Sequence, residues 1–207
     1  MTKKQTPQLL RFSHKDATTH KITNKYQGFF KLDEYHISHK LFRGGESDLL
    51  NREIFERGDA VVLMPYDPIH DTVLLLEQFR PGAIRDNESP WLLEFVAGMF
   101  DENEMPEQVA IREAEEEAGL VLNQSALIPV MKYFSSPGGM TERIHLYAAK
   151  TDLSAIAGVH GLPEEGEDIL AHVLSRSEAI DLLVQGKITN AATIIGLQWL
   201  ALNYSQL

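Results

Sequence analysis

The stretch of sequence from residue 98 to residue 120 reads GMFDENEMPEQVAIREAEEEAGL. The positions that carry its pattern are Gly98, Glu104, Arg112, Glu113, Glu115, Glu116, Glu117 and Gly119. Pro106 suits the first position of a helix, because its missing N–H would have no partner there. Gly119 suits the position just past a helix end, where glycine readily adopts a left-handed conformation. The stretch therefore predicts a loop, a helix from Pro106 to Ala118 and a turn.

Three glutamates of this expected helix share one face. Glu113, Glu116 and Glu117 are spaced i, i+3 and i+4, so at 100° per residue they fall within an arc of about 100°. Glu115 points away from that arc. Like charges at this spacing destabilise a helix by roughly 0.2–0.5 kcal/mol per pair. The helix contains no lysine to relieve the repulsion, and Arg112, four residues before Glu116, is expected to hold only one carboxylate in place.

A divalent cation would remove the repulsion between these carboxylates. Mg²⁺ prefers hard oxygen ligands and usually binds together with a substrate phosphate. The spacing also allows Glu104, which precedes the helix, to fold back onto the same face. The alternative interpretation is a solvated acidic helix without a ligand. An EF-hand is excluded, because its Asp/Asn-rich calcium loop is missing, and the sequence contains no glycine-rich phosphate loop.

The charge of the chain is concentrated in two segments. The 207 residues carry a net charge of −11. Residues 101–117 hold eight acids and one base, residues 164–168 hold four acids and no base, and the remaining residues balance. A net acidic chain argues against broad binding to nucleic acid or to anionic membranes.

Composition excludes several classes of protein. The content of hydrophobic residues (43%) and charged residues (24%) is ordinary for a globular protein and excludes a disordered chain. The absence of cysteine excludes disulfides, zinc–thiolate sites and thiol nucleophiles. The eight histidines have no spacing typical of metal ligands. No apolar run approaches ~18 residues and the start lacks an apolar leader, so a cytoplasmic location is expected.

The remaining pattern predicts an α/β domain after a small β appendage. Residues 1–20 show no clear periodicity and are interpreted as a loose start. Apolar runs predict strands at 27–32, 33–42, 60–65, 72–78, 91–96, 128–134, 143–149 and 169–174. Ser175 and Glu178 fit a capping box that opens a helix, and Asn190 is suited to cap a last helix. Strands paired through hairpins imply a mixed sheet.

Residues 98–120 resemble the Nudix box and fill each of its fixed positions. The likeness covers most of the chain and points to the bacterial ADP-ribose pyrophosphatase branch of the Nudix hydrolase family. The stretches that carry it are Gly28–Phe30, Arg52–Gly58, Glu77–Arg80, Trp91–Gly98, Ser136–Gly139, Glu142–Arg143 and His160–Asp168. Enzymes of this branch hydrolyse ADP-ribose to AMP and ribose 5-phosphate, and the resemblance implies the same activity here.

The resemblance also implies a fold and a domain organisation. The fold class is α/β (α+β), a Nudix-type mixed-sheet α/β/α sandwich with a small N-terminal antiparallel β domain. Residues 1–57 would form that β domain, which serves dimerisation and nucleoside contacts, and residues 58–207 would form the Nudix hydrolase domain. Such enzymes are homodimers, and the N-terminal domain of each subunit reaches toward the site of its partner.

By the same resemblance, the first acidic segment binds magnesium, with manganese as a second possible metal. Glu113 and Glu117 would be the main ligands, and the backbone carbonyl of Ala97 would be another. Glu167, from the second acidic segment, would join them when substrate is bound. The resemblance thus implies that the two acidic segments meet at one site.

The general base is also implied by the resemblance. Glu165 matches the residue that deprotonates the attacking water, and Glu116 lies close to the metal ligands as a second catalytic residue. A slip of register would give the role of Glu165 to Glu164 or Glu167. Without the resemblance, this cluster is interpreted as a mobile acidic loop.

Contacts with the substrate complete the implied site. Arg80 would contact the diphosphate, and Phe29 and Phe30 would contact adenine, although adjacent strand residues point to opposite faces, so at most one would stack. The other matching positions are Arg52, Glu53, Met99, Ser136 and Glu142. From the residues alone, Arg80 is an ordinary surface arginine, the two phenylalanines are core residues, and Ser136 belongs to a plain turn.

Three other functions are compatible with the sequence. The first is a Nudix hydrolase that acts on another nucleoside diphosphate sugar or on a dinucleotide. The second is a sensor that binds ADP-ribose without cleaving it, and the third is a structural acidic domain. Sensors normally lose carboxylates of the box, whereas this chain keeps them all.

Overall fold

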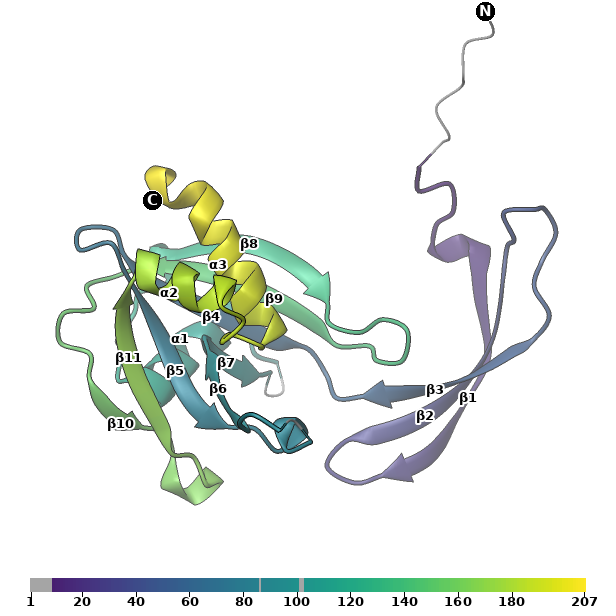
Figure 1. The fold of residues 1–207 in the computed structure, drawn as a ribbon. Coiled ribbons are helices and arrows are strands. Elements are labelled where there is room, and N and C mark those ends of the chain that lie inside the picture. The colour runs from purple at the N-terminus through teal and green to yellow at the C-terminus, as the bar shows by residue number, and fades with distance from the viewer. Residues whose placement is uncertain (1–8, 86, 101–102) are drawn as a thin grey trace, which may run out of the picture. The chain divides into compact units, whose positions relative to one another are not determined.

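Figure 1 shows the computed structural model of the protein, which describes residues 9–85, 87–100 and 103–207. Asp101 and Glu102, which the sequence places in the first acidic segment, lie outside the described residues. The chain divides into two compact units. The first comprises Met1–Arg57 and Ser136–Thr141, and the second comprises Gly58–Ser135 and Glu142–Leu207.

The first unit is a three-stranded antiparallel sheet with the order β1-β2-β3. Its elements are the 3₁₀ helix η1 (His14–Asp16), β1 (Ala17–Gln27), β2 (Lys31–His39) and β3 (Leu50–Glu56). Met140 attaches the segment Ser136–Thr141 to this sheet through a bridge to Phe55. In the three strands, Ser38 is the one buried residue, so the sheet by itself has almost no core.

The antiparallel β architecture expected of this unit is confirmed, but the strand bounds predicted within it were partly wrong. The described part of the supposed loose start contains η1 and the first residues of β1. The strands predicted at 27–32 and 33–42 are a turn and a single strand, because the Gly28 N–H donates to the Phe30 carbonyl (2.9 Å) and β2 runs through the predicted break. β3 was not predicted. A sheet without a buried face produces no alternation of apolar and polar residues, so the pattern carried little information.

The second unit is built on an eight-stranded sheet. Its order is β10-β11-β5-β4-β9-β8, with β6 paired to β5 and β7 paired to β4. The strands are β4 (Ala60–Asp67), β5 (Thr72–Phe79), β6 (Trp91–Glu94), β7 (Val96–Met99), β8 (Leu127–Phe134), β9 (Arg143–Lys150), β10 (Gly158–His160) and β11 (Ile169–Ser175). Strands β4 and β9 pair in parallel and the other pairs are antiparallel, so the predicted mixed sheet is confirmed.

Helices cover both faces of this sheet (Figure 1). On one face lies α1 (Pro106–Ala118), and on the other lie α2 (Arg176–Val184) and α3 (Ala191–Asn203). Alternate residues of β4 divide between two cores. Val61 and Leu63 pack with α1, whereas Val62 and Met64 pack with α2 and α3. The arrangement confirms the α/β/α sandwich.

Local signals placed the helices correctly. The predicted and observed bounds of α1 coincide, and Gly119 after its end has a φ of +62°. The Ser175 hydroxyl accepts from the Glu178 N–H (3.2 Å), which forms the predicted capping box of α2. The Asn190 side chain accepts from the Thr193 N–H (3.0 Å) and caps α3.

Two features of the second sheet were missed. The single strand predicted at 91–96 is broken into β6 and β7 around the buried Phe95. The ring of Phe95 packs against Gly196 of α3, where an added Cβ would overlap it. The short strand β10 was not predicted either. Both features depend on contacts between segments that are far apart in the sequence.

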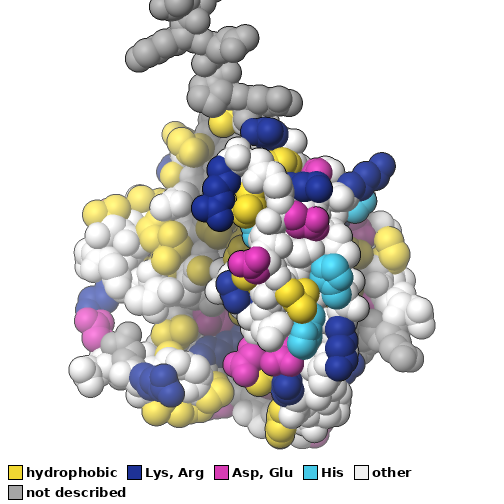
Figure 2. Space-filling view, turned by 90° about the vertical axis from the view of Figure 1, so that its right-hand side faces the viewer, with side chains coloured by type: hydrophobic (Ala, Val, Ile, Leu, Met, Phe, Trp, Pro, Cys, Tyr) yellow, Lys and Arg dark blue, Asp and Glu magenta, His cyan; other side chains and the backbone are white. Residues whose placement is uncertain are grey.

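Charges of both signs are mixed on the face shown in Figure 2, where Lys, Arg and His side chains lie among Asp and Glu. In the described part of the chain, none of the helices has the length and apolar character needed to cross a membrane.

Candidate active site

The glutamates of helix α1 are arranged as their spacing in the sequence predicted. Its buried residues Val109, Ala110, Ala114 and Ala118 turn one side of the helix toward the sheet. Glu113 and Glu116 are half-buried beside that side, and Glu117 is only 2% exposed, whereas Glu115 faces solvent. The prediction that Glu115 points away from the other three is therefore confirmed.

Glu117 is a carboxylate held inside the protein. Its Oε2 accepts a hydrogen bond from the Ala97 N–H in β7, at 2.9 Å. The pKa of Glu117 is raised to about 8, chiefly by burial, with further contributions from the nearby Glu113 and Glu167, while the Ala97 hydrogen bond and the charge of Arg80 lower it. A group with such a pKa resists ionisation unless a positive charge is supplied.

The side chain of Glu113 packs against Gly98 of β7. An added Cβ on Gly98 would overlap the Glu113 side chain, so the absence of a side chain at position 98 makes this placement possible. The pKa of Glu113 is raised to about 7, chiefly by burial, with smaller contributions from Glu116 and Glu167, while Arg112 lowers it. Two adjacent carboxylates on α1 thus both have raised pKa values.

Arg112 contacts three carboxylates rather than the single one predicted. Its Nη1 donates to Glu113 (2.8 Å) and Glu116 (3.0 Å), while Nε and Nη2 donate to the two oxygens of Glu104 (3.2 and 3.1 Å). The prediction was wrong because the guanidinium has five N–H donors in a fixed fork. The expected return of Glu104 onto this face of the helix is confirmed.

The second acidic segment lies beside α1. The Gly161 N–H donates to the carbonyl of Glu116 (3.1 Å), and the side chain of Glu167 accepts from the Leu162 N–H (3.0 Å). Glu167 contributes to the raised pKa of both Glu113 and Glu117, so its charge reaches the face formed by α1. The two acidic segments therefore meet, as the resemblance implied.

Glu164 and Glu165 lie in the same loop as Glu167. They form the 3₁₀ helix η4 (Pro163–Glu165), which ends at Gly166 with a φ of +75°, and both side chains are exposed. The loop folds back on itself, because the Glu165 and Glu167 N–H groups both donate to the Leu162 carbonyl. Of the three glutamates, Glu167 is the one placed against α1.

Three expected substrate contacts belong to the second unit. Arg80 follows β5, and its charge lowers the pKa of Glu117. The Met99 carbonyl accepts from Arg112 Nη2 (3.3 Å). Glu142 is buried and accepts from the Ser135 hydroxyl (2.6 Å). Arg80 is thus linked to Glu117 of α1 through its charge. Met99 is linked to the carboxylates of α1 through Arg112, which donates hydrogen bonds to both.

The other expected contacts belong to the first unit. Phe29 and Phe30 lie in the turn before β2 rather than on a strand, because β1 ends at Gln27. Phe30 packs edge-on against Phe55 (5.2 Å between ring centroids), whereas Phe29 is 88% exposed. Arg52 and Glu53 are exposed on β3, and the Ser136 carbonyl accepts from Gly139 and Met140 in the attached turn. Phe29 is therefore the freer of the two rings.

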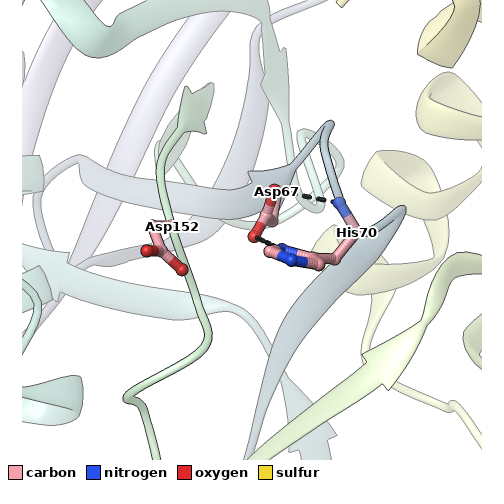
Figure 3. A group of neighbouring side chains, drawn as sticks. All are labelled: Asp67, His70 and Asp152. Atoms are coloured by element: carbon pink, nitrogen blue, oxygen red, sulfur yellow. Dashed lines mark hydrogen bonds and ion pairs between the residues drawn. The ribbon is translucent and has the colours of Figure 1, made fainter.

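A group of possible ligand atoms lies apart from α1. Among the described residues, three such atoms lie within 4.8 Å of one another only at Asp67, His70 and Asp152 (Figure 3). Both oxygens of the buried Asp67 are already used, because Oδ1 accepts from the Ile69 and His70 N–H groups and Oδ2 accepts from His70 Nδ1 and the Leu153 N–H. We interpret this group as a cap on the β4–β5 turn.

Comparison with known proteins decides the family. The model of the NUDIX domain matches residues 56–191. This chain belongs to the Nudix family. The family expected from residues 98–120 is therefore confirmed, and Nudix hydrolases generally use a divalent metal ion.

Relatives of this Nudix chain carry names that specify a substrate. The ADP-ribose pyrophosphatase of Escherichia coli K12 is 50% identical over 182 residues, which cover 88% of this chain and 86% of the relative. The ADP-ribose pyrophosphatase of Haemophilus influenzae is 45% identical over 208 residues, with 99% and 95% covered. The GDP-mannose pyrophosphatase of Pectobacterium atrosepticum is 37% identical over 171 residues, with 82% and 86% covered.

A solved structure supports the Nudix fold. The crystal structure of an ADP compounds hydrolase matches with a TM-score of 0.68, covering 94% of this chain and 98% of that chain. Its sequence identity is 19%, so the match bears on the fold alone.

Proposed function

We propose that this Nudix protein hydrolyses the diphosphate bond of ADP-ribose and releases AMP and ribose 5-phosphate. The observation that carries the proposal is the buried carboxylate of Glu117. It shares one face of α1 with Glu113, and the charge of Glu167 raises its pKa. Support for the substrate comes from relatives named ADP-ribose pyrophosphatase, which are 45–50% identical over most of the chain.

The proposed cofactor is Mg²⁺, with Mn²⁺ as a possible substitute. The donor set fits such an ion, because carboxylate oxygens are hard ligands and a bound cation would offset the burial and the carboxylate repulsion that raise the pKa of Glu113 and Glu117. Glu113, Glu117 and Glu167 would hold it. The Ala97 carbonyl would also contribute, since the N–H and C=O of one strand residue face the same edge and this N–H faces Glu117. When bound, Mg²⁺ stabilises negative charge on the diphosphate and lowers the pKa of a water molecule.

The chain's own residues divide the chemistry between them. Arg80 binds a diphosphate oxygen and holds the substrate against α1. The oxygen of a water molecule attacks one phosphorus, the bond between that phosphorus and the bridging oxygen breaks, and the carboxylate of Glu165 takes the proton of the water. Glu116 stays hydrogen-bonded to Arg112, so it keeps that guanidinium aligned with Glu113.

Replacing glutamates of the loop by glutamine, one at a time, tests which of them is the general base. Glu165→Gln is expected to lower kcat by roughly 10²–10⁴-fold, the usual contribution of a positioned base. Glu164→Gln is the matched control, since both side chains are exposed in η4. A Glu165→Gln enzyme with normal kcat, together with an inactive Glu164→Gln enzyme, transfers the role to Glu164.

The first unit is proposed to serve dimerisation and nucleoside contact. A three-stranded sheet usually needs a hydrophobic face covered by other elements, and this one buries a single strand residue. Phe29 and Phe30 would contact adenine. Substrate contacts are also proposed for Arg52, Glu53, Met99, Ser136 and Glu142. Sedimentation equilibrium measures the oligomeric state, and a monomer at micromolar concentration contradicts the homodimer.

The activity is tested by incubating the protein with ADP-ribose and Mg²⁺ and separating the products by chromatography. Formation of AMP and ribose 5-phosphate is expected, and folded protein that releases no AMP contradicts the proposal. GDP-mannose and a dinucleotide serve as comparison substrates, because a relative at 37% identity is named for GDP-mannose. Saturable binding of ADP-ribose without cleavage would instead identify a sensor.

A further inference from the structure

Glu94 is a buried carboxylate with no place in the chemistry above. It is the last residue of β6 and only 3% of it is exposed. Its Oε2 lies 2.8 Å from both Nε and Nη2 of Arg80, and its Oε1 accepts from Asn190 Nδ2 at 2.9 Å. Gln78 adds a longer hydrogen bond to Oε2 (3.4 Å). Glu94 therefore connects the end of β5 to the start of α3.

Only one side of the Arg80 guanidinium is used by this contact. The Nε–Nη2 edge faces Glu94, whereas Nη1 makes no hydrogen bond within the described residues, and 40% of the side chain is exposed. The backbone of Arg80 is fixed too, because its N–H donates to the Pro90 carbonyl (2.8 Å). The charge of Arg80 lowers the pKa of Glu117, so the guanidinium lies in the same region as the α1 carboxylates.

Position 94 requires a carboxylate to satisfy both partners. Arg80 and Asn190 Nδ2 are donors and each takes one oxygen of Glu94. The Asn190 side chain has no freedom to turn its oxygen toward position 94, because Oδ1 already accepts from the N–H and the hydroxyl of Thr193. A glutamine has one acceptor and one donor at its tip, so it would leave one of these donors unpaired.

We propose that Glu94 is the positioning residue for Arg80, which it holds with the Nη1 edge free to bind a diphosphate oxygen. The inference rests on the proposed function, since it assigns Arg80 to the diphosphate. Glu94 acts only through the guanidinium and does not touch the substrate. Asn190 extends the arrangement, because the capped N-terminus of α3 holds the second oxygen of Glu94.

A double-mutant cycle separates positioning from a general structural role. The variants are Glu94→Gln, Arg80→Ala and their combination, and the probe is ADP-ribose with a methylene group in place of the bridging oxygen, in the presence of Mg²⁺. We expect Glu94→Gln to weaken binding roughly tenfold, since a small displacement of a binding group is costly. The combined variant should bind no worse than Arg80→Ala alone, because Glu94 has nothing left to position.

Kinetics provide a second readout. A partly unfolded enzyme loses kcat in proportion to its inactive fraction while KM is unchanged, whereas a misplaced binding group raises KM. Glu94→Gln should therefore raise KM for ADP-ribose more than it lowers kcat. Glu94→Asp keeps both acceptor oxygens and should recover part of the loss.

The matched control is another arginine–carboxylate pair of the same unit. Asp71 accepts from Nε and Nη2 of Arg176, both at 2.8 Å, and ties the β4–β5 turn to α2. Asp71→Asn is expected to lower the melting temperature without weakening the binding of the methylene analogue. A similar loss of analogue binding in Asp71→Asn and Glu94→Gln would mean that both act through stability and would overturn the proposal.

A ligand-independent measurement distinguishes this proposal from the proposed function. The ¹⁵N–¹H signal of Arg80 Nε, assigned by its loss in Arg80→Ala, should exchange slowly with water in the native protein and rapidly in Glu94→Gln. Additive losses in the double-mutant cycle, or an unchanged Nε signal in Glu94→Gln, overturn the positioning role. A native protein that shows the Nε effect but does not hydrolyse ADP-ribose contradicts only the proposed substrate.

Discussion

The carboxylate of Glu117 accepts a hydrogen bond from the backbone N–H of Ala97, with 2.9 Å between Oε2 and the nitrogen. This bond joins the last turn of α1 to β7 and holds a carboxylate in an environment that is 2% exposed. One hydrogen bond offsets only part of the cost of burying a charge, so the pKa of Glu117 rises to about 8. Stability and activity therefore make opposite demands on this side chain.

Glu117→Gln should separate these demands. The change keeps the shape of the side chain and removes its charge, so kcat with Mg²⁺ should fall by about a hundredfold or more. Without metal and above about pH 8, where Glu117 is ionised, the melting temperature should stay level or rise by a few degrees, because the repulsion from Glu113 and Glu167 is relieved. Glu115→Gln, on the exposed face of α1, is the control and should change both quantities little. A fully active Glu117→Gln enzyme would remove Glu117 from the site.

The stability of the metal-free protein should fall as pH rises from about 5 to 8. Both Glu113 and Glu117 have a raised pKa in the folded state, about 7 and about 8, so the folded protein binds more protons than the unfolded chain in this range. Their contribution is complete below the unfolded value near 4.5 and is lost as pH rises through the folded values.

Thermal unfolding with and without Mg²⁺ checks this pH dependence. The rise in melting temperature caused by Mg²⁺ should grow with pH, because the ion binds the deprotonated carboxylates. Comparison with Glu117→Gln isolates the contribution of this residue from those of the histidines, since the variant should lose part of the slope. Identical slopes in the two proteins would show that Glu117 ionises normally.

Gly98→Ala should impair the site more than the fold. The added Cβ overlaps the side chain of Glu113, which is half-buried and would have to move away from β7. We expect a roughly tenfold loss of kcat/KM together with weaker stabilisation by Mg²⁺. The control is Gly82→Ala, where an added Cβ meets no atom within 4 Å. Equal kinetics in the two variants would contradict the tight packing of Glu113 against β7.

Arg112→Ala should destabilise the protein through charge repulsion. Removal of the guanidinium leaves Glu104, Glu113 and Glu116 close together without their shared donor. We expect the free energy of unfolding, measured in urea, to fall by about 1–3 kcal/mol. Mg²⁺ should restore part of this loss, and Arg112→Lys should lose less than Arg112→Ala. A loss that Mg²⁺ does not reduce would mean that the packing of Arg112 matters more than its charge.

Asp67→Asn should lower stability without changing catalysis. Burial alone would raise the pKa of Asp67, but hydrogen bonds from His70 and from backbone N–H groups bring it below its usual value. The buried carboxylate is therefore ionised at neutral pH, and its loss should cost about 1–3 kcal/mol in the free energy of unfolding. Asp152→Asn, at an exposed neighbour, is the control. A drop in kcat/KM in Asp67→Asn that exceeds its loss of folded protein would assign this group a role in activity.

The sequence predicted most reliably what neighbouring residues decide among themselves. The bounds of α1 followed from Pro106 and Gly119, and the caps of α2 and α3 followed from Ser175 and Asn190. The grouping of Glu113, Glu116 and Glu117 followed from the helical repeat alone. These features span a few residues each, so the information needed to form them is contained in the same short segments.

Only the tertiary structure decided which distant segments meet. The strand bounds of the first unit were predicted poorly, because its strands bury a single residue and leave little apolar pattern to detect. Glu94 is separated from Arg80 by 14 positions and from Asn190 by 96 positions in the sequence. The residues around each of these positions therefore gave no basis for predicting the contacts. The sequence thus determined the carboxylate face of α1, whereas the burial that raises the pKa of Glu117 and the support behind Arg80 arise only when the sheet and the helices pack together.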